Sequence, residues 1–204
     1  MYKDNPEKDQ DRANDCLEIF EQTGDVLYEQ NHKVYEGIAI MVHGKTVLEA
    51  GCGMGKGSYI LAEHNKVIGT DKLDKNIKFA QALYQRIYFD KWDLNGEPYP
   101  IKHDVVVCVE TIEHVENWKR ALANLIESAT EEVWISTPNR NVLNQEGPDN
   151  PYHVHEFETK EMIDLISLLG GTRIKKIELL HWDTFAELPV DTKVHPIVYH
   201  ICLN

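Results

Sequence analysis

The chain has 204 residues, 42% of them hydrophobic, and a formal net charge of −13 with histidine counted as neutral. This length suits one domain with a sizeable core. The acidic excess disfavours nonspecific nucleic-acid binding and adhesion to anionic membranes, because both need lysine and arginine. The four cysteines, at positions 16, 52, 108 and 202, have no paired spacing, which predicts reduced thiols in a cytoplasmic protein.

The first 44 residues are expected to form a tail and a helical cap. Residues 1–15 are highly charged and lack the apolar core of a signal peptide, and no later apolar stretch approaches membrane-spanning length. Residues 13–23 predict a short helix, and residues 26–42 predict a second one because their apolar positions keep a helical period. Both helices precede the first strand, so they would either cover a ligand site as a lid or pack on the sheet edge.

Residues 45–204 are expected to form one α/β domain. Helices are predicted over 58–64, 75–84, 117–128 and 159–169, and strands over 46–50, 67–71, 86–89, 104–109, 132–136, 173–180 and 198–203. This alternation indicates a doubly wound, mostly parallel seven-stranded sheet. Ligands of such sheets bind beyond the carboxyl ends of the strands. At or just beyond these predicted ends lie Glu49, Asp71, Asp93, Glu110 and Thr137.

A glycine-rich turn follows the first strand, and residues 49–58 read Glu-Ala-Gly-Cys-Gly-Met-Gly-Lys-Gly-Ser. Glycine lets a ligand approach the backbone closely, and the next helix points its first N–H groups over the turn. The turn therefore predicts a site for an adenosine-bearing cofactor. It lacks the third glycine of a dinucleotide fingerprint, which would fall on Lys56 or Ser58, and the Lys-Ser/Thr pair of a P-loop.

Three later segments follow the glycine-rich turn, each at or just after a predicted strand. They are Gly-Thr-Asp at 69–71, Trp-Asp-Leu at 92–94, and the apolar strand at 104–109 with Glu-Thr-Ile-Glu-His-Val at 110–115. Together they resemble the motifs of class I S-adenosylmethionine-dependent methyltransferases, in a form similar to small-molecule O-methyltransferases. Residues 136–140 and 150–157 extend the resemblance, which covers about residues 28–169. It implies a Rossmann-like methyltransferase fold with S-adenosylmethionine as cofactor and S-adenosylhomocysteine as product.

The resemblance also implies which residues bind the cofactor. They are Glu49, Gly51, Cys52, Gly53, Gly55, Asp71, Lys72, Asp93, Leu94 and Glu110. Asp71 would accept both ribose hydroxyls, Asp93 would accept from the adenine amino group, and Glu49 would orient the cofactor's own amino group. Alternatively, Asp71 caps a helix and Asp93 only forms a turn.

Candidate catalytic residues cluster after the fourth strand. Glu110, Glu113 and His114 have the spacing that one helical turn brings to one face, and His153 and His155 lie on the loop after the fifth strand. Our hypothesis is that His114 or His153 is the general base, because imidazole titrates near neutrality, and that Glu113 orients it. The alternative is a polar pocket wall that binds substrate without proton transfer.

We expect O-methylation of a small metabolite or sugar-type acceptor. A first alternative is an RNA ribose 2′-O-methyltransferase, because Glu-x-x-Glu-His and the later histidines resemble the metal site of such enzymes and could hold Mg²⁺ or a transition metal. A second alternative is a non-catalytic S-adenosylmethionine-binding regulatory subunit. A divalent metal, a nucleic-acid partner and a membrane partner are not expected, and the sequence leaves the acceptor, the O- or N-specificity and the oligomeric state open.

Overall fold

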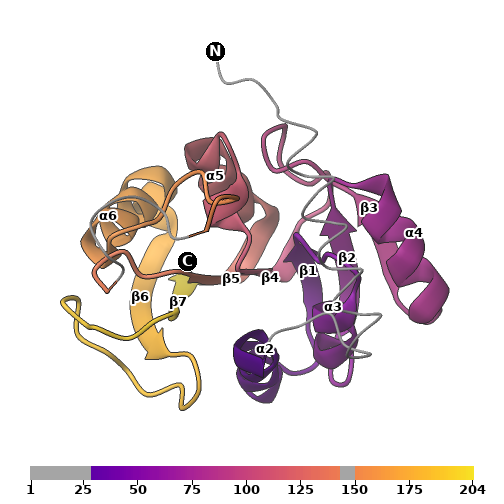
Figure 1. Ribbon diagram of the computed structural model, residues 1–204, viewed down its shortest axis with the longest axis horizontal. Coiled ribbons are helices and arrows are strands. Elements are labelled where there is room, and N and C mark those ends of the chain that lie inside the picture. Colours follow the sequence, from indigo (N-terminus) through magenta and orange to yellow (C-terminus); the bar gives the residue numbers. More distant parts are fainter. Residues whose placement is uncertain (1–28, 143–149) are drawn as a thin grey trace.

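The computed structural model describes residues 29–142 and 150–204, which form one seven-stranded sheet with helices on both faces (Figure 1). The helix predicted at 13–23 and the start of the one predicted at 26–42 lie outside the described residues. The strands are β1 (Thr46–Ala50), β2 (Lys66–Asp71), β3 (Tyr88–Lys91), β4 (His103–Val109), β5 (Ala129–Thr137), β6 (Ile174–His181) and β7 (Ile197–Leu203). The helices are α2 (Glu29–Met41), α3 (Lys56–Leu61), α4 (Asp74–Leu83), α5 (Trp118–Ser128) and α6 (Thr159–Gly170), with short 3-10 turns η1 (Ile112–His114) and η2 (Gly171–Arg173).

The strand order β3-β2-β1-β4-β5-β7-β6 confirms the predicted fold class. Strands β1 to β5 pair in parallel, whereas β7 runs antiparallel to both β5 and β6, so the sheet is mixed. The chain winds outward from β1 to β3 and then returns to place β4 on the other side of β1. This reversal makes the β1/β4 boundary the topological switch point, where α/β sheets bind ligands.

Helices α5 and α6 cover one face of the sheet, and α2 and α3 cover the other (Figure 1). Helix α5 buries Leu122, Leu125 and Ile126 against the sheet, and each buried side chain of this size stabilises the fold by about 2 kcal/mol. The Asn117 side chain caps α5 by accepting a hydrogen bond from the Arg120 N–H. Among residues 29–142 and 150–204, none of the helices is long and apolar enough to cross a membrane.

Helix α2 lies on the sheet as a layer. Val34 and Ile38 are fully buried and share a hydrophobic cluster with Val47 of β1 and Val105 of β4. The helix predicted at 26–42 therefore packs on the central strands of the sheet rather than on its edge. No described residue of α2 lines the cavity beyond the carboxyl ends of the parallel strands. The division of the chain at residue 44 stays a prediction.

Several predicted element boundaries differ from the structure, among them the start of β5, which lies at 129 where 132 was predicted. Helix α3 starts at Lys56, two residues before the predicted start, because Gly55 adopts a positive φ of 88° and turns the chain into the helix early. Strand β3 spans 88–91 where 86–89 was predicted, since its pairing partner β2 extends to Asp71 and aligns it with Lys91. Trp92 and Asp93 still follow directly after the strand.

A buried carboxyl group ties α2, β1 and α3 together. Glu49 is completely buried, and its oxygens accept hydrogen bonds from the Tyr35 hydroxyl at 2.6 Å and from the Ser58 hydroxyl. Burial raises the pKa of Glu49 to about 7; the two hydroxyl groups oppose this rise and the charge of Asp71 adds to it. The same burial raises the pKa of Tyr35 well above its ordinary value.

This raised pKa predicts pH-dependent stability. Between the ordinary pKa of 4.5 and the folded pKa of about 7, the folded state binds more protons than the unfolded state, so the free energy of unfolding falls as the pH rises through this window. We expect Glu49 to contribute a fall of up to about 3 kcal/mol between pH 4.5 and 8. Urea unfolding at pH 5 and pH 8 should show this loss in the wild type and not in Glu49→Gln, whose amide does not titrate. The same pH dependence in both proteins would contradict it.

Candidate functional site

A cavity opens beyond the carboxyl ends of β1, β2, β3 and β4, at the predicted edge of the sheet. The predicted cofactor residues that line it are Gly51, Gly53, Asp71, Lys72, Asp93 and Leu94. The rest of its wall is formed by Leu73, Asn76, Trp92, Asn95, Thr111, His114 and Val115. The candidate base His114 therefore belongs to the same cavity as the candidate cofactor residues.

The glycine turn after β1 requires glycine at position 51. Gly51 has a φ of +75°, and a Cβ there would lie 2.3 Å from Cγ2 of Thr111 on the turn after β4. The Thr111 hydroxyl donates to the Val109 carbonyl at 3.0 Å and reaches the Gly51 carbonyl at 3.4 Å. The turn after β1 and the turn after β4 are thus in direct contact, and a side chain at Gly51 would push them apart.

Asp71 combines a structural role with a place in the cavity wall. Its Oδ2 accepts the Gly53 N–H at 3.0 Å and its Oδ1 accepts the Leu73 N–H at 2.8 Å. These bonds fix the carboxylate between the glycine turn and the start of α4. A carboxylate has about four lone-pair sites, so these bonds leave capacity for ribose hydroxyls. The ribose contact stays a prediction.

Asp93 forms a turn, which was the alternative interpretation of this residue, and it also lines the cavity. Its Oδ1 accepts both the backbone N–H and the side-chain amide of Asn95 at 2.9 Å. The indole of Trp92 donates to the Glu97 carbonyl at 2.9 Å, which fixes the start of the same loop. These hydrogen bonds stabilise the loop, and Leu94 lines the cavity beside Asp93.

Four predicted cofactor residues are absent from the cavity wall: Glu49, Cys52, Gly55 and Glu110. Side chains alternate along a strand, so Glu49 points to the α2 face, where Tyr35 and Ser58 take the place that was predicted for the cofactor's amino group. Cys52 packs in a small buried cluster, and a Cβ on Gly55 would meet Ala80 and Phe89 rather than the cavity.

The predicted common face of Glu110, Glu113 and His114 is wrong for Glu110. Glu110 has a φ of 45°, and η1 begins only at Ile112, so no regular helical turn connects Glu110 to the other two residues. Its carboxylate instead accepts a hydrogen bond from the Ser136 hydroxyl, and its N–H donates to the Ser136 carbonyl at 2.9 Å. A left-handed backbone at a non-glycine residue costs about 1–3 kcal/mol, which these bonds to β5 offset.

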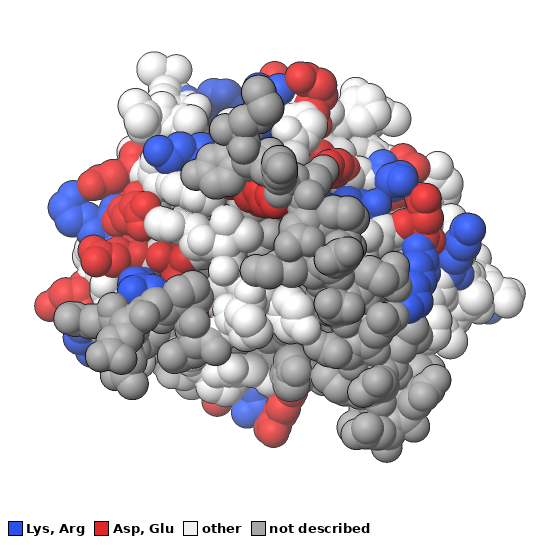
Figure 2. All heavy atoms as spheres, turned by 45° about the horizontal axis from the view of Figure 1, so that its top comes forward, with Lys and Arg blue, Asp and Glu red and all other residues white. Residues whose placement is uncertain are grey.

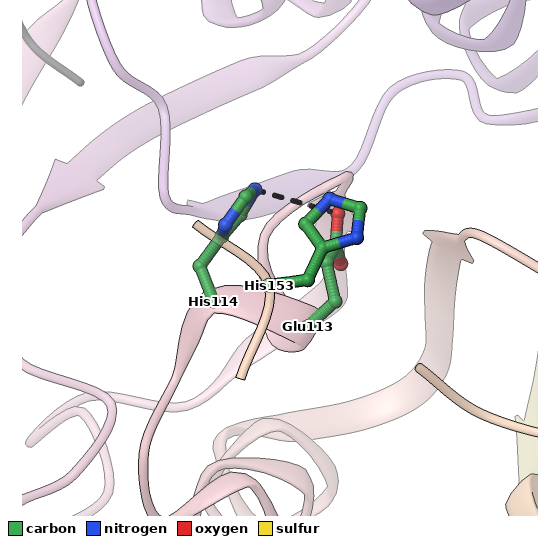
Figure 3. Close-up of side chains that lie close together, drawn as sticks. All are labelled: Glu113, His114 and His153. Carbon is green, nitrogen blue, oxygen red and sulfur yellow. Dashed lines mark ion pairs between the residues drawn. The ribbon is translucent and has the colours of Figure 1, made fainter. Parts of the chain in front are cut away.

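Glu113, His114 and His153 come together as predicted (Figure 3). One carboxylate oxygen and one ring nitrogen from each histidine all lie within 4.8 Å of one another. Oε1 of Glu113 is 3.7 Å from Nε2 of His114, and the two imidazole rings meet edge to face with centroids 4.9 Å apart. The Glu113 side chain is 1% exposed, and its Oε2 accepts the Thr137 hydroxyl at 3.1 Å.

Backbone hydrogen bonds bring His153 to this cluster across 40 residues of sequence. The Glu113 carbonyl accepts the N–H of Val154 at 2.7 Å and that of His155 at 3.2 Å. In return, Nδ1 of His114 donates to the Tyr152 carbonyl at 3.0 Å. A carbonyl only accepts, so a neutral His114 carries its proton on Nδ1 and its lone pair on Nε2.

Glu156 is a site residue that the sequence analysis missed. Its side chain is fully buried, and its Oε1 accepts from Nδ1 of His153 at 2.7 Å while its Oε2 binds Arg140 at 3.2 Å. It therefore orients His153 and leaves the Nε2 lone pair of a neutral ring as its acceptor. Glu113 faces Nε2 of His114 at 3.7 Å, and its predicted role in orienting the base stays a prediction. The spacing His-x-x-Glu at 153–156 was the available signal.

His155 lies outside the cluster. Its ring stacks on Trp118 with centroids 4.5 Å apart, and its Nε2 bonds to Glu161 at 3.0 Å. These contacts hold the loop against α5 and α6. His155 is therefore a useful control for the two clustered histidines.

Comparisons with known proteins bear on the family of the chain and not on its individual site residues. A protein-family model described as a methyltransferase domain matches residues 28–177. A probable S-adenosylmethionine-dependent methyltransferase of Mycolicibacterium smegmatis is 29% identical over 167 residues, which make up 79% of this chain and 65% of that relative. The chain thus spans less than two thirds of that relative's length.

Two further matches are a relative similar over part of its sequence and a solved structure similar in fold. A ubiquinone biosynthesis O-methyltransferase of Idiomarina loihiensis is 34% identical over 112 residues, which cover 48% of this chain and 44% of that protein. The crystal structure of a TehB-like S-adenosylmethionine-dependent methyltransferase from Corynebacterium glutamicum superposes with a TM-score of 0.67 over 98% of this chain and all of that one, at 16% identity. At this identity the superposition supports the fold alone.

The contact between Gly51 and Thr111 predicts the effect of one methyl group on ligand binding. Gly51→Ala places a Cβ against Thr111 at a positive φ, and we expect the affinity for S-adenosylhomocysteine to fall by about tenfold or more. The matched control is Gly44→Ala, which has a similar φ of +69° but no atom within 4 Å of the added Cβ. Calorimetric titration should show unchanged affinity for the control. Unchanged affinity for both variants would place the ligand elsewhere.

Proposed function

Because this chain belongs to the class I S-adenosylmethionine-dependent methyltransferases, we propose that it transfers a methyl group to a hydroxyl oxygen of a small acceptor. The observation that carries the proposal is the cluster of Glu113, His114 and His153 beside the cavity. His114 belongs both to the cluster and to the cavity wall, so proton-accepting groups stand next to the expected cofactor. The name of the Idiomarina relative supports oxygen as the methylated atom.

The donor supplies a methyl group on a positively charged sulfur, which needs no further activation. As the bond from the acceptor oxygen to the methyl carbon forms, the carbon–sulfur bond breaks and its electron pair goes to sulfur. The protein has two tasks: it aligns the acceptor with the methyl group, and it takes the hydroxyl proton.

We assign the general base to His153. Its Nε2 takes the acceptor's proton, and the buried Glu156 carboxylate on Nδ1 stabilises the imidazolium that forms, as in other carboxylate–histidine pairs. His114 has only the neutral Tyr152 carbonyl on its Nδ1 and lines the cavity, so we assign it to binding and positioning the acceptor. Glu113 faces Nε2 of His114 and adds negative charge beside the hydroxyl group.

A metal-assisted form of the same reaction is the second candidate. The cluster offers one carboxylate and two imidazoles, a donor set that suits Zn²⁺ or another transition metal better than Mg²⁺. Glu113, His114 and His153 would hold the ion, which would lower the pKa of an acceptor hydroxyl. The sequence pattern that suggested a metal site also included Glu110 and His155, but these two residues lie outside the cluster of Glu113, His114 and His153.

The described part of the face shown in Figure 2 gives no support to an RNA acceptor. On the described part of the face shown in Figure 2, lysine and arginine are interspersed with aspartate and glutamate rather than gathered in one patch. A phosphate backbone needs concentrated positive charge, and the whole chain carries a net charge of −13.

A transfer screen tests the proposed reaction. With S-adenosylmethionine labelled in its methyl group, we expect label in hydroxyl compounds such as phenols, catechols or sugars, and not in amines or RNA. The rate should persist in the chelator EDTA. Transfer to RNA alone would contradict the proposal, and loss of rate in EDTA with recovery on adding metal would favour the second candidate. Binding of S-adenosylhomocysteine without transfer to any acceptor would favour a non-catalytic binding role.

With the acceptor so identified, substitutions test the assignment of the base. His153→Ala should lower kcat by about 10²-fold or more, and Glu156→Gln by a smaller factor with KM unchanged, since Glu156 acts through His153. His114→Ala should raise KM more than it lowers kcat. The control His155→Ala removes a neighbouring imidazole outside the cluster and should keep kcat within about twofold. If His114→Ala and His153→Ala both keep the full rate, proton transfer to these histidines is not part of the reaction.

A further inference from the structure

A second group of possible metal ligands lies far from the cavity, on the antiparallel part of the sheet. In the pairing register, Trp134 of β5, His200 of β7 and Glu178 of β6 stand side by side in one row. Glu132 and Cys202 stand side by side in the row two residues further along. Residues two apart on a strand point to the same face, so the rows place His200, Cys202 and the two carboxylates together.

The distances in this group match those of a zinc site. One ligand atom each from Glu178, His200 and Cys202 lie within 4.8 Å of one another. Sγ of Cys202 is 3.6 Å from Nε2 of His200. Tetrahedral zinc with bonds of about 2.0 Å to nitrogen and about 2.3 Å to sulfur holds these two atoms about 3.5 Å apart.

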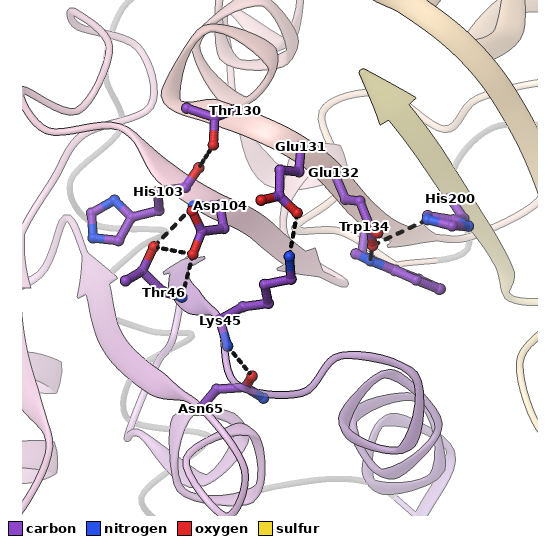
Figure 4. Close-up of polar contacts among 10 residues, drawn as sticks. All are labelled: Lys45, Thr46, Asn65, His103, Asp104, Thr130, Glu131, Glu132, Trp134 and His200. Carbon is purple, nitrogen blue, oxygen red and sulfur yellow. Dashed lines mark hydrogen bonds and ion pairs between the residues drawn. The ribbon is translucent and has the colours of Figure 1, made fainter. Parts of the chain in front are cut away.

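The imidazole of His200 is already held in one orientation. Its Nδ1 is 3.0 Å from Glu178. Its Nε2 is 3.2 Å from Glu132, and the same Glu132 oxygen also accepts the indole N–H of Trp134 at 2.9 Å (Figure 4). The ring lies flat on Trp134, with centroids 3.9 Å apart and an angle of 13° between the planes. For an ion on Nε2, beside Sγ of Cys202, the Glu178 carboxylate would exchange its contact with Nδ1 for a bond to the metal.

The group is open enough to take up an ion. The side chain of His200 is 10% exposed, that of Glu178 is 21% exposed and that of Glu132 is 31% exposed. Two carboxylates face one imidazole and one thiol, and Lys176 binds the second oxygen of Glu178 at 2.6 Å. A divalent cation would therefore balance the local charge once the thiol gives up its proton.

We propose that Glu178, His200 and Cys202 form a site for Zn²⁺ that fastens β7 to the edge strand β6. The combination of thiolate, imidazole and carboxylate favours zinc over magnesium or calcium, which prefer oxygen ligands alone. On binding, the Cys202 thiol releases its proton to solvent and a sulfur–metal bond forms. The site takes no part in methyl transfer, since its residues lie on β6 and β7 and none of them lines the cavity.

Cobalt substitution tests the proposal with a readout that depends on sulfur. Co²⁺ added to the metal-free reduced protein should give a near-ultraviolet thiolate-to-cobalt absorption that saturates at one equivalent and disappears when Zn²⁺ is added. Cys202→Ser and His200→Ala should abolish this absorption. His153→Ala is the matched control and should keep it, because the Glu113, His114 and His153 cluster contains no sulfur.

The outcomes distinguish metal binding at Glu178, His200 and Cys202 from metal binding at Glu113, His114 and His153. They also test the zinc site independently of the proposed methyl transfer. No thiolate absorption in the wild-type protein, or absorption that persists in Cys202→Ser, would overturn the zinc site whether or not the protein transfers methyl groups. A zinc-dependent rise in Tm in the wild type that is missing in Cys202→Ser would support the role in fastening β7. The same rise in both proteins would overturn that role.

Discussion

The contact between the turn after β1 and the turn after β4 is the constraint on which the rest of the site depends. Gly51 has no side chain and Thr111 packs directly against it, so the two turns meet at the switch point of the sheet. The first turn carries the expected cofactor residues, and the second leads within three residues to His114. The contact would therefore set the distance between a donor bound at the first turn, as proposed, and the groups proposed to receive a proton.

A second set of contacts builds the part of the site that carries the candidate catalytic residues. The Glu113 carbonyl accepts two N–H groups from the loop that carries His153, and His114 donates to the Tyr152 carbonyl of the same loop. These bonds join backbone to backbone and side chain to backbone, so they survive variation in the loop's side chains. The buried Glu156 then fixes the His153 ring, with Arg140 balancing its charge.

The fold and most of the cavity could be predicted from the sequence, because strand periodicity and strand ends are local features. Asp71, Asp93 and the glycines fell at the predicted edge since every parallel strand ends there. Alternation within β1 points Glu49 to the α2 face, towards Tyr35, so its predicted contact with the cofactor's amino group stays a prediction. Glu110 was misjudged because its positive φ breaks the expected helical turn, and no residue pattern signals such a backbone.

The partners of the histidines depend on contacts distant in sequence. Glu156 could be noticed three residues after His153, but its burial and its pairing with Arg140 arise only when the loop packs on η1. The cross-strand group of Glu178, His200 and Cys202 likewise depends on the register of β6 and β7, which the sequence does not specify. Local pattern thus predicts the frame of the site, and tertiary pairing decides which side chains meet in it.

A crystal structure with bound S-adenosylhomocysteine would test most directly whether the two turns form one methyl-transfer site. We expect the ribose hydroxyls to lie about 2.5–3.0 Å from the Asp71 carboxylate, the adenine beside Asp93 and Leu94, and the sulfur on the side of His114 and His153. The product bound outside this cavity, or bound in it with its sulfur turned away from both histidines, would contradict the assignment.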